Sequence, residues 1–151
     1  MCALSGLAEL PVPVDQRRIV VGVDASETGA LALEWAIQEA RRWPAVVDVV
    51  TAWTFPMTKS YAITHSVDEV EEAARKVVEA AMSRVIEEAP DVVVRGETAD
   101  GEAGPVLVDA ARGADLLVVG SRRAGTFERV FLGSVGAYCG RHASCSVMIV
   151  R

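Results

Sequence analysis

Leu116-Leu117-Val118-Val119-Gly120 is the purest apolar run in the chain. A short run of this kind, without alternating polar residues, is typical of a strand buried on both faces of a parallel sheet. We therefore place a central strand at residues 116–120 and expect helices to cover both of its faces.

Four other stretches, rich in β-branched residues, also have the composition of strands. They are residues 18–24 (Arg-Ile-Val-Val-Gly-Val-Asp), 46–53, 91–97 and 146–150. Segments with helical periodicity separate these strands. We expect helices from the capping hydroxyls of Ser26 and Thr28 to residues 43–44, from 66 to 90, from Pro105 onward, and from 134 to 142.

The strict alternation of strands and helices predicts one α/β fold with parallel strands and right-handed crossovers. We expect a doubly wound five-stranded parallel sheet of order 3-2-1-4-5, with helices on both faces, as in Rossmann-like folds. Ligands of such sheets bind beyond the carboxyl ends of the strands, where the strand order reverses. The loops after Asp24, Trp53 and Gly120 are therefore the candidate binding loops.

The composition limits the function. The chain has 151 residues, 51% of them hydrophobic, and a formal net charge of -6. That charge opposes binding to nucleic acid or to an anionic membrane, and no apolar run approaches the ~20 residues of a membrane-spanning helix. We expect a cytoplasmic domain at residues 17–151 after a flexible tail at 1–16, with Cys2, Cys139 and Cys145 as free thiols and no metal site.

The segment after the central strand contains the candidate binding motif. Gly120 ends the strand, and Gly133-Ser134 precedes the expected helix at 134–142. The free amides of a first helical turn, with the Ser134 hydroxyl, have a geometry that binds phosphate. Taken alone, however, a Gly-Ser pair before a helix is also a common helix cap.

These motifs together resemble the universal stress protein family, over essentially the whole chain from Arg18 to Arg151. The resemblance rests on Val-Gly-Val-Asp24-Ala-Ser, Ala-Trp53 with a nearby Pro, Asp115-Leu-Leu-Val-Val-Gly-Ser-Arg, Leu132-Gly-Ser-Val and Cys145-Ser-Val-Met-Ile-Val. Nucleotide-binding members carry Gly, two residues, Gly, nine residues, Gly and then Ser or Thr. Gly120 and Gly133-Ser134 stand at the first and last places of that pattern.

The resemblance implies a stress-response module that binds ATP, with or without Mg²⁺, or a related adenine nucleotide. In this reading Asp24 contacts the ribose or adenine side of the nucleotide, and Ala52 flanks the base. Asp24 is equally suited to capping the turn after its strand, and Ala52 to core packing. The implied binding residues are Gly22, Val23, Asp24, Ala52, Gly120, Arg122, Arg123, Gly125, Gly133, Ser134 and Val135.

Arg123 departs from the pattern, because it stands where the second glycine is expected. A side chain there obstructs a site that needs a positive φ or a close phosphate, although Gly125 can take over the turn and Arg122 can contact phosphate. The alternative is therefore a nucleotide-free member that acts as a protein-interaction module. A third alternative is an enzyme that hydrolyses ATP or transfers phosphate; the sequence assigns no catalytic residue, so we expect at most weak ATPase activity.

The last strand predicts self-association. It carries Val147 and Ile149 and lies at an edge of the expected sheet. An exposed apolar edge favours pairing with a second copy, and family members commonly dimerise through this strand. We expect a homodimer through it, and in addition a protein partner of unknown identity.

Overall fold

The structure, a computed structural model, describes residues 16–56, 65–121 and 133–151. Five parallel strands form one sheet in the order β3-β2-β1-β4-β5, which confirms the expected doubly wound fold. The elements are β1 (Arg17–Gly22), α1 (Glu27–Arg42), β2 (Ala45–Trp53), α3 (Val67–Glu88), β3 (Val94–Asp100), α4 (Ala103–Ala110), β4 (Leu116–Gly120), α5 (Ser134–His142) and β5 (Ser146–Val150).

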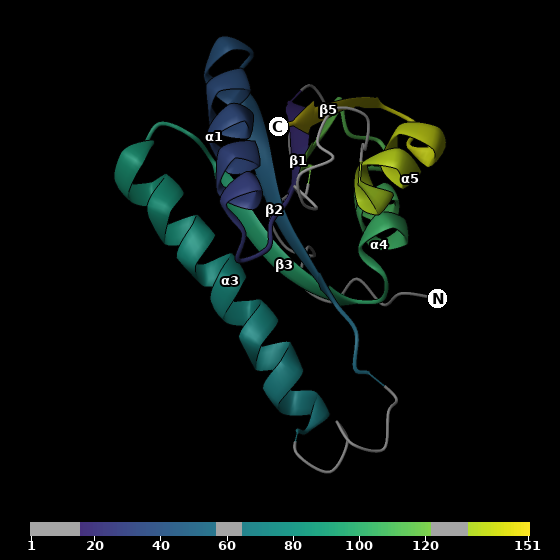
Figure 1. Cartoon of the computed structure of the whole chain (residues 1–151). Coiled ribbons are helices and arrows are strands. Elements are labelled where there is room, and N and C mark those ends of the chain that lie inside the picture. Colours follow the sequence, from purple (N-terminus) through teal and green to yellow (C-terminus); the bar gives the residue numbers. More distant parts are fainter. Residues whose placement is uncertain (1–15, 57–64, 122–132) are drawn as a thin grey trace.

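Helices cover both faces of the sheet, with α1 and α3 on one face and α4 and α5 on the other (Figure 1). Alternate residues of the central strands serve the two faces: Val21 and Val118 pack toward α1 and α3, whereas Val20 and Leu117 pack toward α4 and α5. All four are fully buried. The β1–β4 pair is therefore the centre of the molecule, as the apolar run at 116–120 predicts.

Local capping interactions begin the two longest helices where the sequence predicts. The Ser26 side chain accepts a hydrogen bond from the Gly29 amide at the start of α1. Ser66 and Glu69 form a capping box at the start of α3, each side chain bonded to the backbone amide of the other residue. Within the described residues, no helix has the length and apolar character needed to cross a membrane.

Several boundaries differ from the expectation, and β1 ends at Gly22 rather than near Asp24. The third strand covers Val94–Asp100 rather than residues 91–97, because the apolar residue Val92 belongs to a turn, where its amide bonds the Ala89 carbonyl. The next helix begins at Ala103 rather than near Pro105. Its Pro105 lies in the first turn, where the missing amide hydrogen removes no helical hydrogen bond.

A charge cluster around the buried Asp48 joins the edge strand β3 to the two strands beside it. Asp48 of β2 is 1% exposed and accepts two hydrogen bonds from Arg95 of β3, at 2.7 and 2.8 Å. Arg18 of β1 adds a contact at 3.4 Å and also donates to the carbonyls of Ala110 and Arg112. The cluster ties three neighbouring strands to the end of α4 on one face of the sheet.

Glu97 lies on the same face of β3 as Arg95, two residues along the strand. Its side chain is 5% exposed, and within the described part of the chain neither carboxylate oxygen has a hydrogen-bond partner. Burial raises the pKa of Glu97, and the negative charge of Asp48 raises it further, while Arg18 and Arg95 lower it. The folded chain therefore holds a proton on Glu97 more strongly than the unfolded chain does.

This raised pKa predicts that the contribution of Glu97 to stability falls as pH rises. The stabilising contribution of protonated Glu97 is complete below the ordinary carboxyl pKa of 4.5 and is lost as pH rises through the higher folded-state pKa. We expect Glu97→Gln to stabilise the fold more at about pH 8 than at about pH 5. Urea unfolding across this pH range checks the effect, and Glu87→Gln, at an exposed position of α3, is the control. An equal effect of Glu97→Gln at both pH values would contradict the assignment.

Candidate functional site

The carboxyl edge of the sheet has a step next to β1. Gly22, the last residue of β1, pairs with Val50, whereas β2 continues to Trp53 beside β3. The turn after β1 is bonded to β2: the Val23 amide donates to the Val50 carbonyl, and the Thr51 hydroxyl donates to the Val23 carbonyl, both at 3.0 Å. The strand order reverses here, because β1 lies between β2 and β4.

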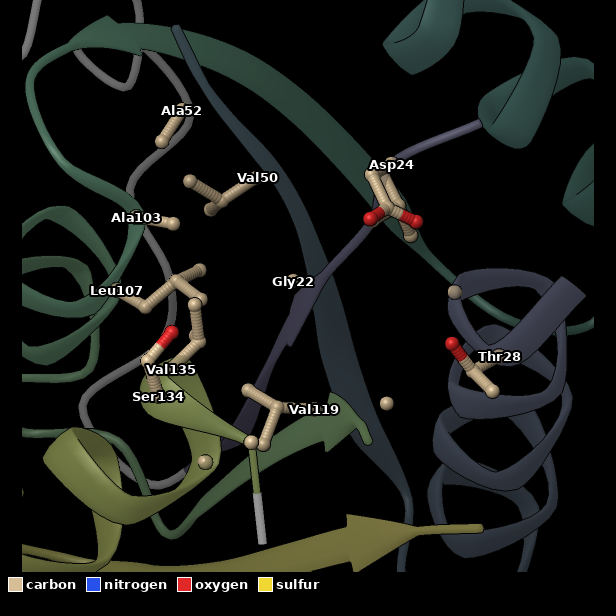
Figure 2. A pocket seen from close by; sticks show the side chains of 15 residues that line it. Gly22, Asp24, Thr28, Val50, Ala52, Ala103, Leu107, Val119, Ser134 and Val135 are labelled. Carbon is tan, nitrogen blue, oxygen red and sulfur yellow. The ribbon is translucent and has the colours of Figure 1, made fainter. Parts of the chain in front are cut away.

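A pocket of about 310 Å³ occupies this step. Figure 2 shows Asp24 and Thr28 on one side of it, with Leu107, Ser134 and Val135 on the other. The floor comes from the strand ends, including Val50, Val119 and Gly120, and the walls from the starts of three helices. Its volume falls within the range of about 300–1,000 Å³ that is usual for small-molecule sites.

Three helix amino termini meet at the pocket. The first turn of α1 contributes Thr28 and Gly29, α4 contributes Ala103, and α5 contributes its first three residues with Gly133, its N-cap. Every crossover helix runs opposite to the strands, so each begins at the carboxyl edge. Backbone amides and helix dipoles at such termini favour negative charge. The pocket is therefore suited to an anionic group, although the whole chain is acidic.

Asp24 is held in place by its own turn. One of its carboxylate oxygens accepts a hydrogen bond from the Ser26 amide at 3.0 Å and another from the Ser26 hydroxyl. The Ser26 hydroxyl in turn accepts from the Gly29 amide. Asp24 therefore has the turn-capping role that its position suggests, and this network fixes its side chain at the pocket wall.

Two glycines permit the backbone geometry of the site. A Cβ atom on Gly120 would lie 2.5 Å from the Thr28 carbonyl oxygen, so a side chain there would separate β4 from α1. Gly133 has φ 68° and ψ 153°, a conformation that residues with a side chain rarely adopt. These glycines bring the start of α1 and the start of α5 to the same end of β4.

The structure brings together the sequence-predicted site residues that it describes. All eight of them line the pocket: Gly22, Val23, Asp24, Ala52, Gly120, Gly133, Ser134 and Val135. The other three, Arg122, Arg123 and Gly125, lie outside the described residues. The binding role of all eleven stays a prediction, because lining a pocket is not evidence of a ligand.

Seven further residues line the pocket and escaped the sequence analysis: Thr28, Gly29, Val50, Ala103, Leu107, Val119 and Gly136. Val50 precedes Ala52 by two residues on β2, so strand periodicity could have identified it. Ala103 was missed because the helix was expected to begin at Pro105. Thr28 could not be found from spacing, since its place depends on the packing of α1 against β4.

The described residues give little indication of metal binding or of reactive thiols. Within the described residues no group of three His, Cys, Asp or Glu side chains could hold a metal ion. Cys139 and Cys145 are free thiols. Burial raises the pKa of Cys139 to about 11 and also raises that of Cys145, which keeps both thiols protonated at neutral pH and poorly nucleophilic.

Comparison with known proteins identifies relatives over nearly the whole chain. A family model described as the universal stress protein family matches residues 16–151. Two universal stress proteins of Mycobacterium tuberculosis strain H37Rv are similar: Rv2624c is 32% identical over 139 residues, and Rv2623 is 34% identical over 144 residues. The matches cover 89% and 88% of this chain but 48% and 47% of the relatives. The chain thus spans about half the length of these curated relatives.

Solved structures agree on the fold. Universal stress protein UspA from Lactobacillus plantarum is 23% identical, with a TM-score of 0.73 over 89% of this chain and 97% of that one. A universal stress protein crystallised in complex with cAMP is 26% identical, with a TM-score of 0.67 and the same coverage.

The tight contact at Gly120 predicts a loss of stability on substitution. Gly120→Ala places a methyl group against the Thr28 backbone and should cost about 1–3 kcal/mol in the free energy of unfolding. The matched control is Gly140→Ala in α5, where the added methyl group meets no atom of the described chain within 4 Å outside its neighbours and its own helix backbone. The control should be neutral or stabilising by up to about 1 kcal/mol. Chemical denaturation checks both variants, and equal midpoints would disprove the proposed clash.

Proposed function

Because this chain belongs to the universal stress protein family, we propose that it is a cytoplasmic stress-response module that binds ATP or a related adenine nucleotide. The nucleotide occupies the pocket at the carboxyl edge of the sheet. The observation that carries the proposal is the meeting of three helix amino termini with an apolar wall in one pocket.

Two groups of lining residues suit the two ends of a nucleotide. Ser134, Val135 and Gly136 offer the first amides of α5, and Ser134 adds a hydroxyl, which together suit a phosphate group. Val50, Ala52 and Leu107 offer apolar surface that suits a flat base. Asp24, fixed by Ser26, is an acceptor for ribose hydroxyls.

The cAMP complex of a relative supports this assignment, because that protein is 26% identical over most of the same fold. ATP, with or without Mg²⁺, remains the nucleotide implied by the glycine pattern. The alternative is a nucleotide-free member, since Arg123 replaces a glycine of that pattern. An ATP-hydrolysing or phosphate-transferring enzyme has the least support, because the sequence assigns no catalytic residue.

Calorimetric titration with Mg-ATP, AMP and cAMP tests the proposal, alongside mass spectrometry of the native protein for nucleotide that remains bound on purification. We expect saturable binding that Ser134→Ala weakens by about tenfold, because a hydrogen bond to a charged phosphate is lost. Ser83→Ala, on an exposed part of α3, is the matched control and should bind like the unmodified chain.

The variant Arg123→Gly distinguishes a chain that binds nucleotide from a nucleotide-free member of the family. Binding by this variant alone would favour the nucleotide-free reading and identify Arg123 as the obstruction. Absence of heat and of a thermal shift for both chains at millimolar nucleotide would overturn nucleotide binding. Turnover of ATP above that of Ser134→Ala would be needed to support an enzyme.

We also propose a homodimer through β5, and a further protein that recognises it. β5 lies at the edge of the sheet, next to β4 alone. The Val150 carbonyl accepts from the Ser121 amide, so Val150 turns its backbone groups toward β4. Backbone direction alternates along a strand, and Val147 and Ile149 therefore turn theirs toward the free edge. Such an edge favours pairing with a second copy.

Val147→Pro tests the dimer, because it removes an edge amide while leaving the hydrogen bonds to β4. Val147→Ala is the matched control that shortens the side chain and keeps the amide. Val147 and Ile149 both pack against the cluster beneath α4 and α5, so the test changes a backbone amide and introduces no charge there. Light scattering should give a dimer for the unmodified chain and the alanine variant, and a monomer for the proline variant. A monomeric unmodified chain would refute the dimer.

A further inference from the structure

The edge strand β3 presents three side chains on the side of the sheet that α4 and α5 occupy. They are Arg95, Glu97 and Ala99, which alternate along the strand. We call these three residues the outer face of β3. Solvent hardly reaches them: Glu97 is 5% exposed, Ala99 is 2% exposed and the Arg95 side chain is 15% exposed. Such shielding on an edge strand requires a cover.

The described helices have their main contacts elsewhere. α3 packs against β3 from the opposite side of the sheet. α4 packs on β1 and β2, and α5 packs on α4 and on the two strands at the far end of the sheet, β4 and β5. The cover of the outer face of β3 is therefore expected from another part of the chain or from a partner.

The Glu97 carboxyl group shows what the cover has to supply. Within the described residues neither of its oxygens has a hydrogen-bond partner. A buried carboxyl group without hydrogen bonds is costly in either protonation state. The two arginines that act on it, Arg18 and Arg95, are already bonded to Asp48. A cover that brings backbone amides to Glu97 would remove this cost.

Three parts of the sequence lie outside the described residues: 1–15, 57–64 and 122–132. Residues 57–64 lead from β2 to α3, on the opposite side of the sheet, and residues 122–132 leave from β4, three places from β3 in the strand order. Residues 1–15 instead enter at the amino edge, directly before β1. β1 lies two strands from β3, about 10 Å away, and fifteen extended residues reach up to about 50 Å.

We propose that residues 1–15 pack across the outer face of β3 and cover Glu97 together with the Asp48–Arg95 ion pair. Leu4, Leu7 and Leu10 give the segment apolar side chains for such a face. Pro11 and Pro13 favour an extended backbone, in which the amides of neighbouring residues are not used by a helix and can donate to Glu97.

This cover is an addition to the family domain, because the family model matches from residue 16 onward. It does not depend on the binding of a nucleotide, since β3 contributes no residue to the described lining of the nucleotide pocket. Failure of one proposal therefore leaves the other standing.

Carbodiimide labelling of carboxyl groups, read by mass spectrometry, tests the cover on the full chain and on a chain that lacks residues 2–15. Glu97 should be protected in the full chain and should lose this protection in the shortened one. Glu87, exposed on α3, should be labelled equally in both and is the internal control. Circular dichroism shows whether the shortened chain is folded. Equal labelling of Glu97 in two folded chains overturns the proposal.

A pair of full-length variants decides the question if the shortened chain does not fold. Replacing Leu7 and Leu10 together by aspartate should expose Glu97 to labelling, because charged side chains oppose packing on the buried face. Replacing Ser5 and Ala8 together by aspartate adds the same charge and should leave Glu97 protected. Equal labelling in the two variants contradicts the proposal. Protection that is lost on dilution of the full chain would assign the cover to a second copy and would likewise overturn it.

Discussion

All five strands of the sheet run in the same direction, and most of the architecture depends on this shared polarity. Each connecting helix must return against the strands, so α1, α4 and α5 all begin at the carboxyl edge. There the chain leaves β1 toward β2, while β4 lies on the other side of β1. The pocket, its free amides and its positive potential all follow from this arrangement. No single side chain creates the site.

The sequence predicts this arrangement well, because buried parallel strands have a simple composition. The run at residues 116–120 became β4, and the Ser66–Glu69 spacing marked the start of α3. Prediction was poorer where long-range contacts replace local pattern. The edge strand β3 contains Arg95 and Glu97, whose side chains lie beside Asp48 and Arg18 of other strands. Composition alone could not reveal that pairing, so the strand was placed three residues early.

The residues of the candidate site show the same contrast between those that the sequence pattern marks and those that only the packing of the fold brings together. Motif residues such as Gly120 and Ser134 could be identified from the sequence because the family pattern marks them. Thr28 and Leu107 could not, because each reaches the pocket only after its helix packs on the sheet. Gly120 illustrates why a motif residue matters beyond ligand contact: its missing side chain allows the Thr28 carbonyl to approach β4. The glycine is thus required by the packing of α1 whether or not a nucleotide binds.

The contrast between the acidic chain and its helix termini also affects the rate of ligand capture. A net charge of -6 repels an anion at long range, whereas the helix amino termini act only over about a Debye length, close to 10 Å at moderate salt. An anionic ligand therefore meets the protein without electrostatic steering and is attracted only once it is inside the pocket. Tight binding in such a site would come from slow departure of the ligand, not from fast arrival. A site that bound its ligand tightly in this way would respond to a sustained ligand concentration more than to a brief fluctuation.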